Sequence, residues 1–304
     1  MALLETAREQ FRFFKTQRKF YKRHGYFANL QDPRLYSEKI FWRKVYDRNP
    51  LFPEMVDKYR SREYVTKRLG PETARRILVP LLFATQKPED IPFESFSEPY
   101  IVKPNHGSGW LIIAEDPARA NSKEIIQRCR KWLGTTYGQE EMEWAYSKIK
   151  PLIMVELLLK DSQGKPASDY KFHVFHGEVK WVFVMHDRFG NRSFSRYDKF
   201  FYPLAPYPKG EKTHKPKNYE EMVKMAETLS SSLDYVRVDM YNIEGNIFFG
   251  EFTLYPASGL QKLFSLEVER QRGALWNLSH EHMREFRPWF PKWHKSDFPG
   301  KSVL

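Results

Sequence analysis

The stretch VRVDMY at residues 236–241, followed by GEFTLYP at residues 250–256, decides the fold of this chain. Valine alternates with charged residues in the first half, so the charged side chains lie on one face of a predicted strand. Residues 242–246 contain turn formers and predict a hairpin loop before a return strand. The hairpin therefore collects four polar side chains: Arg237, Asp239, Glu251 and Thr253.

Oxygen atoms gathered on one face suit a hard cation such as Mg²⁺, which also takes oxygens from substrate phosphates. An arginine beside such a metal stabilises negative charge as it develops. For one isolated hairpin, a charged surface that faces solvent is the favoured interpretation, because short motifs often match by chance. The rest of the chain favours the metal site.

The composition indicates a globular chain. Its 304 residues are 41% hydrophobic and 16% aromatic, which is enough to bury a core. No run approaches the roughly 18 apolar residues of a membrane span, and the N-terminus lacks the features of a secretory signal. The single cysteine, Cys129, excludes an internal disulfide and favours a reducing cytoplasm, so we expect a cytoplasmic protein.

The charge of the chain predicts an anionic partner. Its 50 Lys and Arg exceed its 38 Asp and Glu, which gives a net charge of +12. Nucleic acid, anionic lipid and an acidic sugar polymer would each satisfy this charge. The sequence has neither an RNP aromatic pair nor paired Cys/His zinc ligands, so we do not expect a nucleic-acid partner.

Two basic and aromatic segments flank the centre of the chain, at residues 1–50 and 266–304. Phe13, Phe20 and Phe27 recur every seven residues, which predicts a helical stripe docked on the main domain. A basic amphipathic helix can also lie on an anionic membrane surface, so peripheral membrane contact remains open. The second segment is expected to pack on the core as a tail.

The central residues 51–265 predict helices mixed with short strands. Helices are expected at residues 36–48, 54–69, 121–133 and 219–232, and strands at 77–83, 99–104, 111–114 and within 149–159. Hairpins are expected at residues 170–185 and 236–253, with a long polar loop at 190–218. Because the strands lie mostly in hairpins, the predicted class is α+β with antiparallel sheets.

Two further segments suggest nucleotide contacts. Lys103 ends a strand before a glycine-bearing loop at residues 104–109, whose backbone N–H groups can close over phosphates. Glu156 opens an apolar connector of the kind that an adenine needs. By themselves, these segments are better explained as an ordinary tight hairpin and a core strand. His106, within the loop, either contacts phosphate or is a structural histidine.

Taken in order, these segments resemble the ATP-grasp superfamily and, within it, the TupA-like ATP-grasp family, named for a teichuronopeptide biosynthesis protein. The resembling phrases are EKIFWRKVYDRNP, VDKYRSREYV, YIVKPNHGSGW, DYKFHVFHGEVK and VRVDMYNIEGNIFFGEFTLYPASG. The resemblance implies an ATP-grasp fold, in which two α+β lobes grip ATP between mainly antiparallel sheets. The lobes would span about residues 54–155 and 156–265, with the N-terminal helical extension added.

The resemblance also implies roles for single residues. Lys58 and Lys103 are similar to the two phosphate-contacting lysines, and Arg237 to the arginine that stabilises the transferring phosphoryl group. The remaining nucleotide-binding set would be His106, Gly107, Ser108, Gly109, Glu156, Leu157, Leu158 and Lys171. The metal set would be Asp239, Glu251 and Thr253. Thr253 stands where the superfamily usually has asparagine, which weakens the expected third Mg²⁺ ligand.

The implied activity is an ATP- and Mg²⁺-dependent ligase that joins a carboxylate to an amine through an acyl phosphate. The family context implies a cell-surface polysaccharide or teichuronopeptide-type polymer, with an acidic carboxylate substrate: a uronic acid, a glycan or an acidic peptide. A kinase on the same fold that phosphorylates a sugar hydroxyl remains an alternative, because fold does not fix the reaction. A degenerate fold that only binds an acidic polymer is the second alternative.

Overall fold

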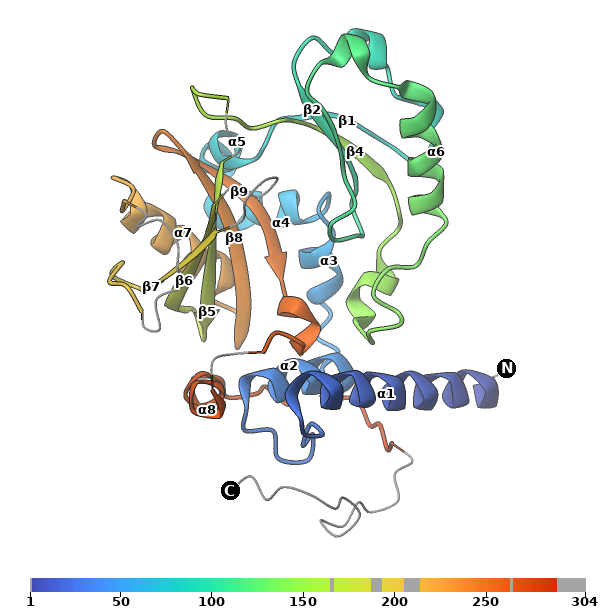
Figure 1. The fold of residues 1–304 in the computed structure, drawn as a ribbon, viewed down its shortest axis with the longest axis vertical. Helices are drawn as coiled ribbons and strands as arrows, with labels where there is room; N and C mark the ends of the chain where they lie inside the picture. Colours follow the sequence, from blue (N-terminus) through green and yellow to red (C-terminus); the bar gives the residue numbers. More distant parts are fainter. Residues whose placement is uncertain (1, 165–166, 187–192, 205–213, 263–264, 289–304) are drawn as a thin grey trace.

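The computed structural model of the protein describes residues 2–164, 167–186, 193–204, 214–262 and 265–288. Within these residues, two antiparallel sheets face each other, and Figure 1 shows the smaller sheet arching above the larger one. The class is α+β, as predicted. The predicted C-terminal tail from residue 289 onward lies outside the described residues.

The first sheet has four strands in the order β1-β4-β2-β3. They are β1 (Leu81–Thr85), β2 (Tyr100–Pro104), β3 (Ile112–Ala114) and β4 (Ile153–Leu157). Helix α6 (Ser122–Leu133) packs on the outer side of this sheet, where Cys129 is fully buried beside Tyr100 and Val102. Burial alternates along β2, so one face meets α6 and the other faces the second sheet.

The second sheet has five strands in the order β7-β6-β5-β8-β9. They are β5 (Ser168–Phe175), β6 (Glu178–His186), β7 (Ser193–Asp198), β8 (Tyr235–Ile243) and β9 (Asn246–Thr253). The turns at His176-Gly177 and Glu244-Gly245 have positive φ at both residues, the geometry of the favoured two-residue hairpin turn. Helix α7 (Tyr219–Ser230) covers one face of this sheet and leaves the other face toward the first sheet.

One helix was predicted at residues 54–69 and a strand from residue 77. The structure has three short helices there instead: α3 (Phe52–Val56), α4 (Ser61–Leu69) and α5 (Pro71–Ile77). Gly70, with φ +84°, ends α4, and Pro71 begins α5, which delays the first strand to residue 81. All three helices share the large hydrophobic core of the second sheet. These helices therefore pack in the core of the second sheet, although they precede the first sheet in the sequence.

Strand β7 lies within the segment that was predicted to be a long loop. Its sequence is polar, but Tyr197 turns into the core and its ring stacks on that of Phe201 at 3.9 Å. One buried aromatic side chain and pairing with β6 hold the strand in the sheet. Residues 205–213 of the predicted loop lie outside the described residues.

The two ends of the described chain pack together below the sheets (Figure 1). They comprise α1 (Ala2–His24), α2 (Tyr36–Val45) and α8 (Leu266–Ala274). Phe13 and Phe20 are buried against Phe41 of α2, as the helical stripe predicted. Phe27 comes after α1 has ended, and its ring stacks on Tyr21 instead.

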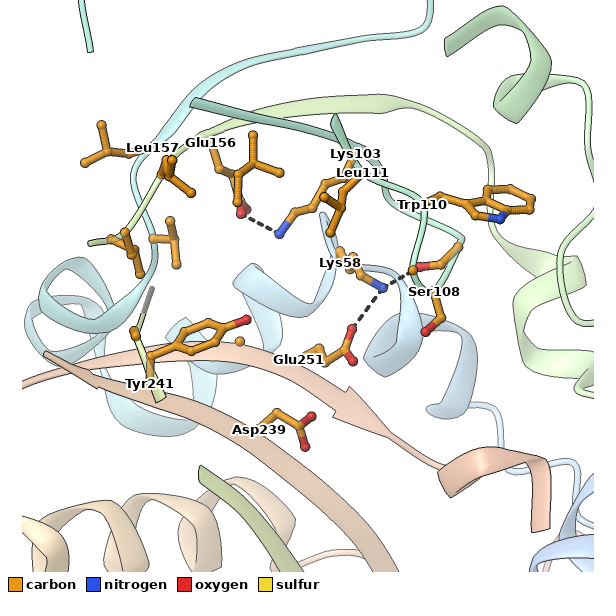
Figure 2. Close-up of a pocket in the computed structure, with 18 residues that line it drawn as sticks. Lys58, Lys103, Ser108, Trp110, Leu111, Glu156, Leu157, Asp239, Tyr241 and Glu251 are labelled. Atoms are coloured by element: carbon orange, nitrogen blue, oxygen red, sulfur yellow. Dashed lines mark hydrogen bonds and ion pairs between the residues drawn. The ribbon is translucent and has the colours of Figure 1, made fainter. Parts of the chain in front are cut away.

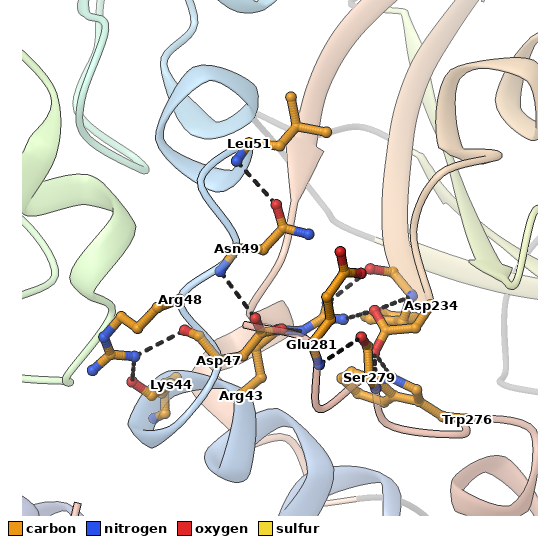
Figure 3. A network of polar contacts seen from close by, with 11 residues as sticks. Arg43, Lys44, Asp47, Arg48, Asn49, Leu51, Asp234, Trp276, Ser279 and Glu281 are labelled. Carbon is orange, nitrogen blue, oxygen red and sulfur yellow. Dashed lines mark hydrogen bonds and ion pairs between the residues drawn. The ribbon is translucent and has the colours of Figure 1, made fainter. Parts of the chain in front are cut away.

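A buried arginine joins these helices to the second sheet (Figure 3). Arg43 of α2 is fully buried and binds the carboxylate of Asp234 just before β8. The guanidinium also lies 3.4 Å from Asp47 and donates to the carbonyl oxygen of Tyr235 at 2.7 Å. Trp276 covers the guanidinium at 4.4 Å and donates its indole N–H to Asp234 at 2.8 Å.

We expect Arg43→Met to lower the free energy of unfolding by about 3–5 kcal/mol, because it leaves two buried carboxylates without their cation. Chemical denaturation followed by tryptophan fluorescence measures the loss. Arg76→Met is the matched control: Arg76 forms an exposed ion pair with Glu221 at 2.6 Å, so its loss should stay within about 1 kcal/mol. Equal effects of the two changes would contradict the importance of the buried cluster.

Candidate active site

A cleft that is open to solvent separates the two sheets (Figure 2). The first sheet and its loops contribute one wall, and strands β8 and β9 contribute the floor. The lining residues include Lys58, Lys103, Gly107, Ser108, Gly109, Trp110, Glu156, Leu157, Leu158, Asp239, Tyr241 and Glu251. Ten of the predicted site residues thus meet in one cleft although they come from five separate parts of the sequence.

Lys58 stands between the two walls of the cleft. It lies in the break between α3 and α4, and its Nζ donates to the carbonyl oxygen of Gly107 at 2.7 Å. The same Nζ forms an ion pair with Glu251 at 3.1 Å. In Figure 2 the lysine accordingly bridges the glycine loop and the floor.

Asn105 fixes the backbone that carries Lys58. Its amide donates to Asp57 at 2.9 Å and to the carbonyl oxygen of Lys150 at 3.1 Å, and it accepts from the N–H of Leu152 at 2.9 Å. The backbone N–H of Lys58 in turn donates to the carbonyl oxygen of Asn105 at 3.0 Å. This buried amide was not among the predicted site residues, since nothing in its local sequence signals these distant partners.

Lys103 reaches the cleft from β2 and is held by Glu156 of β4. Its Nζ lies 2.5 Å from one carboxylate oxygen of Glu156, while Arg62 lies 3.6 Å from the other. Glu156 is buried, so the two cations neutralise a carboxylate that would otherwise be costly to bury. Glu156 therefore lines the cleft as an ionic partner of Lys103, next to the apolar side chains of Leu157 and Leu158.

The glycine loop after β2 places Gly107, Ser108 and Gly109 at the cleft, as predicted from the sequence. A side chain at position 107 would meet the ring of Trp110 at 2.6 Å, so this position requires glycine. His106 points elsewhere: its Nε2 lies 3.1 Å from the carbonyl oxygens of Trp132 and Thr135. Burial lowers the pKa of His106, which favours a neutral ring tied to α6 rather than to the cleft.

The floor of the cleft is the predicted hairpin. Asp239 of β8 stands directly opposite Glu251 of β9, and Arg237 stands opposite Thr253. A β-bulge at Gly250 inserts one extra residue, so Phe249 points into the core while Glu251, two positions later, faces the cleft. Without the bulge, strict alternation would place both side chains on the same face.

Asp239 is the most constrained side chain of the floor. Arg237 binds both of its carboxylate oxygens, at 2.6 and 2.7 Å, and Lys171 of β5 donates to it at 2.8 Å. Burial raises the pKa of Asp239, but Arg237 and Lys171 outweigh burial and lower this pKa to about 2. The carboxylate is therefore ionised at neutral pH.

The floor fits a magnesium ion that shares its coordination with phosphate. Two carboxylates, Asp239 and Glu251, stand opposite each other, and each already attracts a lysine. In the parts of the chain described, no cluster of three or more Asp, Glu, His or Cys is arranged around a metal position. Mg²⁺ needs only one or two carboxylates when phosphates and water complete its shell. The hydroxyl of Thr253 instead accepts from Arg237 at 2.9 Å and does not line the cleft.

Arg237, Lys171 and Thr253 thus lie beside Asp239 on the same face of the sheet, without lining the cleft themselves. Several cleft residues were missed from the sequence, among them Trp110 and Tyr241. Tyr241 could have been found, because it follows Asp239 by two positions on a strand and so shares its face. Trp110 directly follows the glycine loop.

Two facing antiparallel sheets with lysines on one wall and paired carboxylates on the other are the arrangement of an ATP-grasp protein. The family model described as TupA-like ATPgrasp matches residues 38–277, so the chain belongs to this family. The resemblance found in the sequence is thereby confirmed.

Similar solved structures include two D-alanine–D-alanine ligases and an L-amino acid ligase. The ligase from Bacillus anthracis, complexed with ATP, is 17% identical and has a TM-score of 0.38; the alignment covers 66% of this chain and 54% of that one. The ligase from Helicobacter pylori is 14% identical, with a TM-score of 0.44 and coverage of 80% and 67%. The L-amino acid ligase from Bacillus licheniformis is 15% identical, with a TM-score of 0.45 and coverage of 76% and 53%.

The chain spans about half the length of the first of these structures. A search of curated proteins finds no match. The family assignment rests on the family model and on the cleft.

We expect Asn105→Ala to lower the free energy of unfolding by about 3 kcal/mol, because it removes one hydrogen bond from the buried Asp57 and takes the side-chain partner from two backbone groups, the carbonyl of Lys150 and the N–H of Leu152. Urea denaturation measures the loss. Asn121→Ala makes the same change at the N-cap of α6, where one hydrogen bond to Glu124 is lost, and should lose only about 1 kcal/mol. Similar losses at both positions would show that Asn105 does not organise the cleft.

Proposed function

We propose that the protein is an ATP-dependent ligase that joins a carboxylate to an amine. A carboxylate oxygen of the substrate attacks the γ-phosphorus of ATP, so ADP leaves and an acyl phosphate forms. The amine nitrogen then attacks the acyl carbon, inorganic phosphate leaves, and the amine gives up a proton as the amide forms. Membership of the ATP-grasp family supports this reaction class.

The cleft carries the proposal, because it presents cations and carboxylates to the same space. Lys58 and Lys103 face that space from one side and are placed to bind phosphate oxygens. The N–H groups of the glycine loop offer additional donors, and Leu157 and Leu158 give an apolar wall for the base. Most of the rate enhancement in such phosphoryl transfer comes from positioning and from neutralising charge.

Asp239 and Glu251 are the residues that would hold Mg²⁺ in this proposal. When bound, the metal would neutralise phosphate charge and polarise the phosphoryl group. Arg237 keeps Asp239 ionised and oriented through two hydrogen bonds. Its own pKa is raised: burial alone would lower it, but the charge of Asp239 more than compensates, so the guanidinium stays charged. It therefore adds positive charge next to the metal carboxylates.

For the substrates, we propose an acidic carboxylate of the kind found in cell-surface polymers, and an amine. The net charge of +12 supports an anionic acceptor. A sugar kinase would use the same nucleotide residues, so only the products distinguish the two reactions. Incubation with Mg-ATP and a panel of uronic acids and amines, read by mass spectrometry, separates an amide from a phosphorylated sugar.

We expect Mg-ATP to raise the melting temperature and Lys103→Met to abolish this shift. ATP at 100 times its Kd stabilises a protein by about 2.7 kcal/mol, and the variant lacks a charged contact to phosphate. Differential scanning fluorimetry at millimolar Mg-ATP measures both effects. Lys123→Met, on the exposed surface of α6, is the control and should keep the full shift. A parent protein with no shift would refute the nucleotide site.

For the cellular location, we propose a cytoplasmic protein that touches the membrane through α1. Among the helices described, none combines the length and apolar character that crossing a bilayer requires. The outer side of α1 nevertheless exposes Phe11 by 67%, Phe14 by 47% and Tyr21 by 42%. Basic residues lie among these rings along the helix: Arg8, Lys15, Arg18 and Lys22. Such a face suits an anionic lipid surface.

We expect the double change Phe11→Ser and Phe14→Ser to reduce sedimentation with vesicles that contain phosphatidylserine, since apolar insertion is lost while the charge is kept. The parent should sediment with these vesicles and much less with pure phosphatidylcholine. Phe200→Ser with Tyr202→Ser removes two rings of similar exposure, 67% and 68%, away from α1 and should change nothing. Equal sedimentation of parent and both variants would exclude α1 as the contact.

A further inference from the structure

Another pocket lies away from the proposed ATP cleft, beside the N-terminal helix α1. It has a volume of about 450 Å³ and shares no lining residue with the cleft. Its lining includes three arginines, one carboxylate and an apolar wall: Arg12, Arg48, Arg284, Glu9, Met142 and Trp144. These residues come from α1, from the segment after α2, from residues 139–147 and from residue 284, so only the fold brings them together.

Arg48 is held in this pocket by groups that do not neutralise its charge. Its Nη1 donates to the carbonyl oxygens of Asp47 at 2.8 Å and of Lys44 at 3.2 Å, at the end of α2 (Figure 3). Its guanidinium lies 5.0 Å from the centre of the Trp144 ring. Among the described residues, no carboxylate forms an ion pair with Arg48. Two carbonyl groups and one aromatic ring therefore fix a guanidinium that has no direct ionic partner there.

The other two arginines are also fixed, each beside one carboxylate. Arg284 donates through Nε to the carbonyl oxygen of Val45 at 2.6 Å, and its Nη2 pairs with Glu9 at 2.6 Å. Arg12 lies 3.9 Å from Glu140, the distance of a loose ion pair. The backbone after α2 thus holds both Arg48 and Arg284 in place before any ligand arrives, which reduces the entropy lost on binding.

The pocket carries more positive than negative charge. Among the described residues that line it, three arginines stand against one carboxylate, Glu9. Burial and the neighbouring charge of Arg284 lower the pKa of Arg48 to about 10, so its guanidinium stays protonated at neutral pH. Like charges are therefore held close together at a cost to the stability of the fold. A bound anion would lower that cost.

The chemistry of the pocket favours a phosphate group over a carboxylate. A phosphomonoester carries a charge of about −1.5 to −2 at neutral pH, which matches three arginines less one glutamate. Its oxygens point in several directions, so it can accept from more than one guanidinium, and each guanidinium can donate two parallel hydrogen bonds. Met142 and Trp144 offer apolar contact to the rest of a small molecule.

The pocket lies on the opposite side of α1 from the rings proposed to touch a membrane. Glu9 and Arg12 line the pocket, whereas the exposed Phe11 and Phe14 each follow two positions later. Two positions turn a side chain by about 200° around a helix. A lipid held by those rings would therefore not present its headgroup to the pocket, and a soluble ligand fits better.

We propose that Arg48 and Arg284 form a second anion site, which binds the phosphate group of a small soluble molecule apart from the proposed ATP cleft. The inference goes beyond the proposed function and does not depend on it, because the pocket and the cleft have no lining residue in common. Inorganic phosphate and a sugar phosphate share the required chemistry, and the experiment has a separate arm for each.

The experiment measures binding of inorganic phosphate, glucose 6-phosphate and acetate to the full chain by isothermal titration calorimetry, at low salt in a buffer without phosphate. We expect at least one of the two phosphates to bind about tenfold or more tightly than acetate, which carries a single charge. Arg48→Met and Arg284→Met should each weaken that phosphate about tenfold, because each removes a charge-assisted contact. Lys103→Met changes only the cleft and should keep this binding.

Three further variants separate binding from folding. Glu9→Gln removes the carboxylate that competes for Arg284, so it should tighten phosphate binding about fivefold, a gain that unfolding cannot produce. Arg48→Lys keeps the charge but loses the planar donor pair, so it should bind phosphate with intermediate affinity. Arg75→Met removes an exposed arginine of α5 that lines neither pocket and should leave phosphate binding unchanged.

The inference is overturned if neither phosphate binds better than acetate, or if neither Glu9→Gln nor folded Arg48→Met changes the affinity for phosphate. Phosphate binding that is lost in Lys103→Met but kept in the arginine variants would also overturn it, since the phosphate would then lie in the ATP cleft. Arginine-dependent phosphate binding in a protein whose melting temperature does not respond to Mg-ATP would keep this site and refute only the ligase proposal.

Discussion

The ionised side chain of Asp239 is the constraint around which the cleft-facing side of the second sheet is arranged. A buried carboxylate requires charged partners, and here they come from its own strand and from the neighbouring one, as Arg237 and Lys171. Lys171 favours the register in which β5 and β8 meet, because a slip by one residue would turn its side chain to the other face, away from Asp239. The pairing of β8 with β9 places Glu251 opposite Asp239.

Much of this floor could be predicted from the sequence, because strand alternation is a local property. Arg237 and Asp239 are two positions apart, so their common face follows from the period of a strand alone. Family resemblance then added Lys58 and Lys103, which lie far from the hairpin in sequence but in the same cleft. The bulge at Gly250 was not predictable in this way, because it breaks the alternation from which such predictions are made.

The remaining differences between the predictions and the structure concern which element each helix or side chain packs against. An amphipathic pattern shows that a helix has an apolar face but not the element on which that face packs, so α3 to α5 could not be assigned to the second sheet in advance. His106 lies in a loop beside a cleft, and only the carbonyl oxygens of α6 and the following turn show that its ring points away. For Thr253, similarly, only the structure shows that its hydroxyl accepts a hydrogen bond from Arg237 on the neighbouring strand.

The position of Asp234 has a consequence for how the chain folds as it is made. This carboxylate binds Arg43 from early in the chain, and Trp276 and the N–H of Ser279 from late in it. A ribosome releases Arg43 and Asp234 well before the indole that covers them. Until Trp276 emerges, the start of β8 lacks its cover, so the larger sheet completes its core only after Trp276 has been made. A nascent chain stalled before that residue would therefore present an unfinished hydrophobic surface to chaperones.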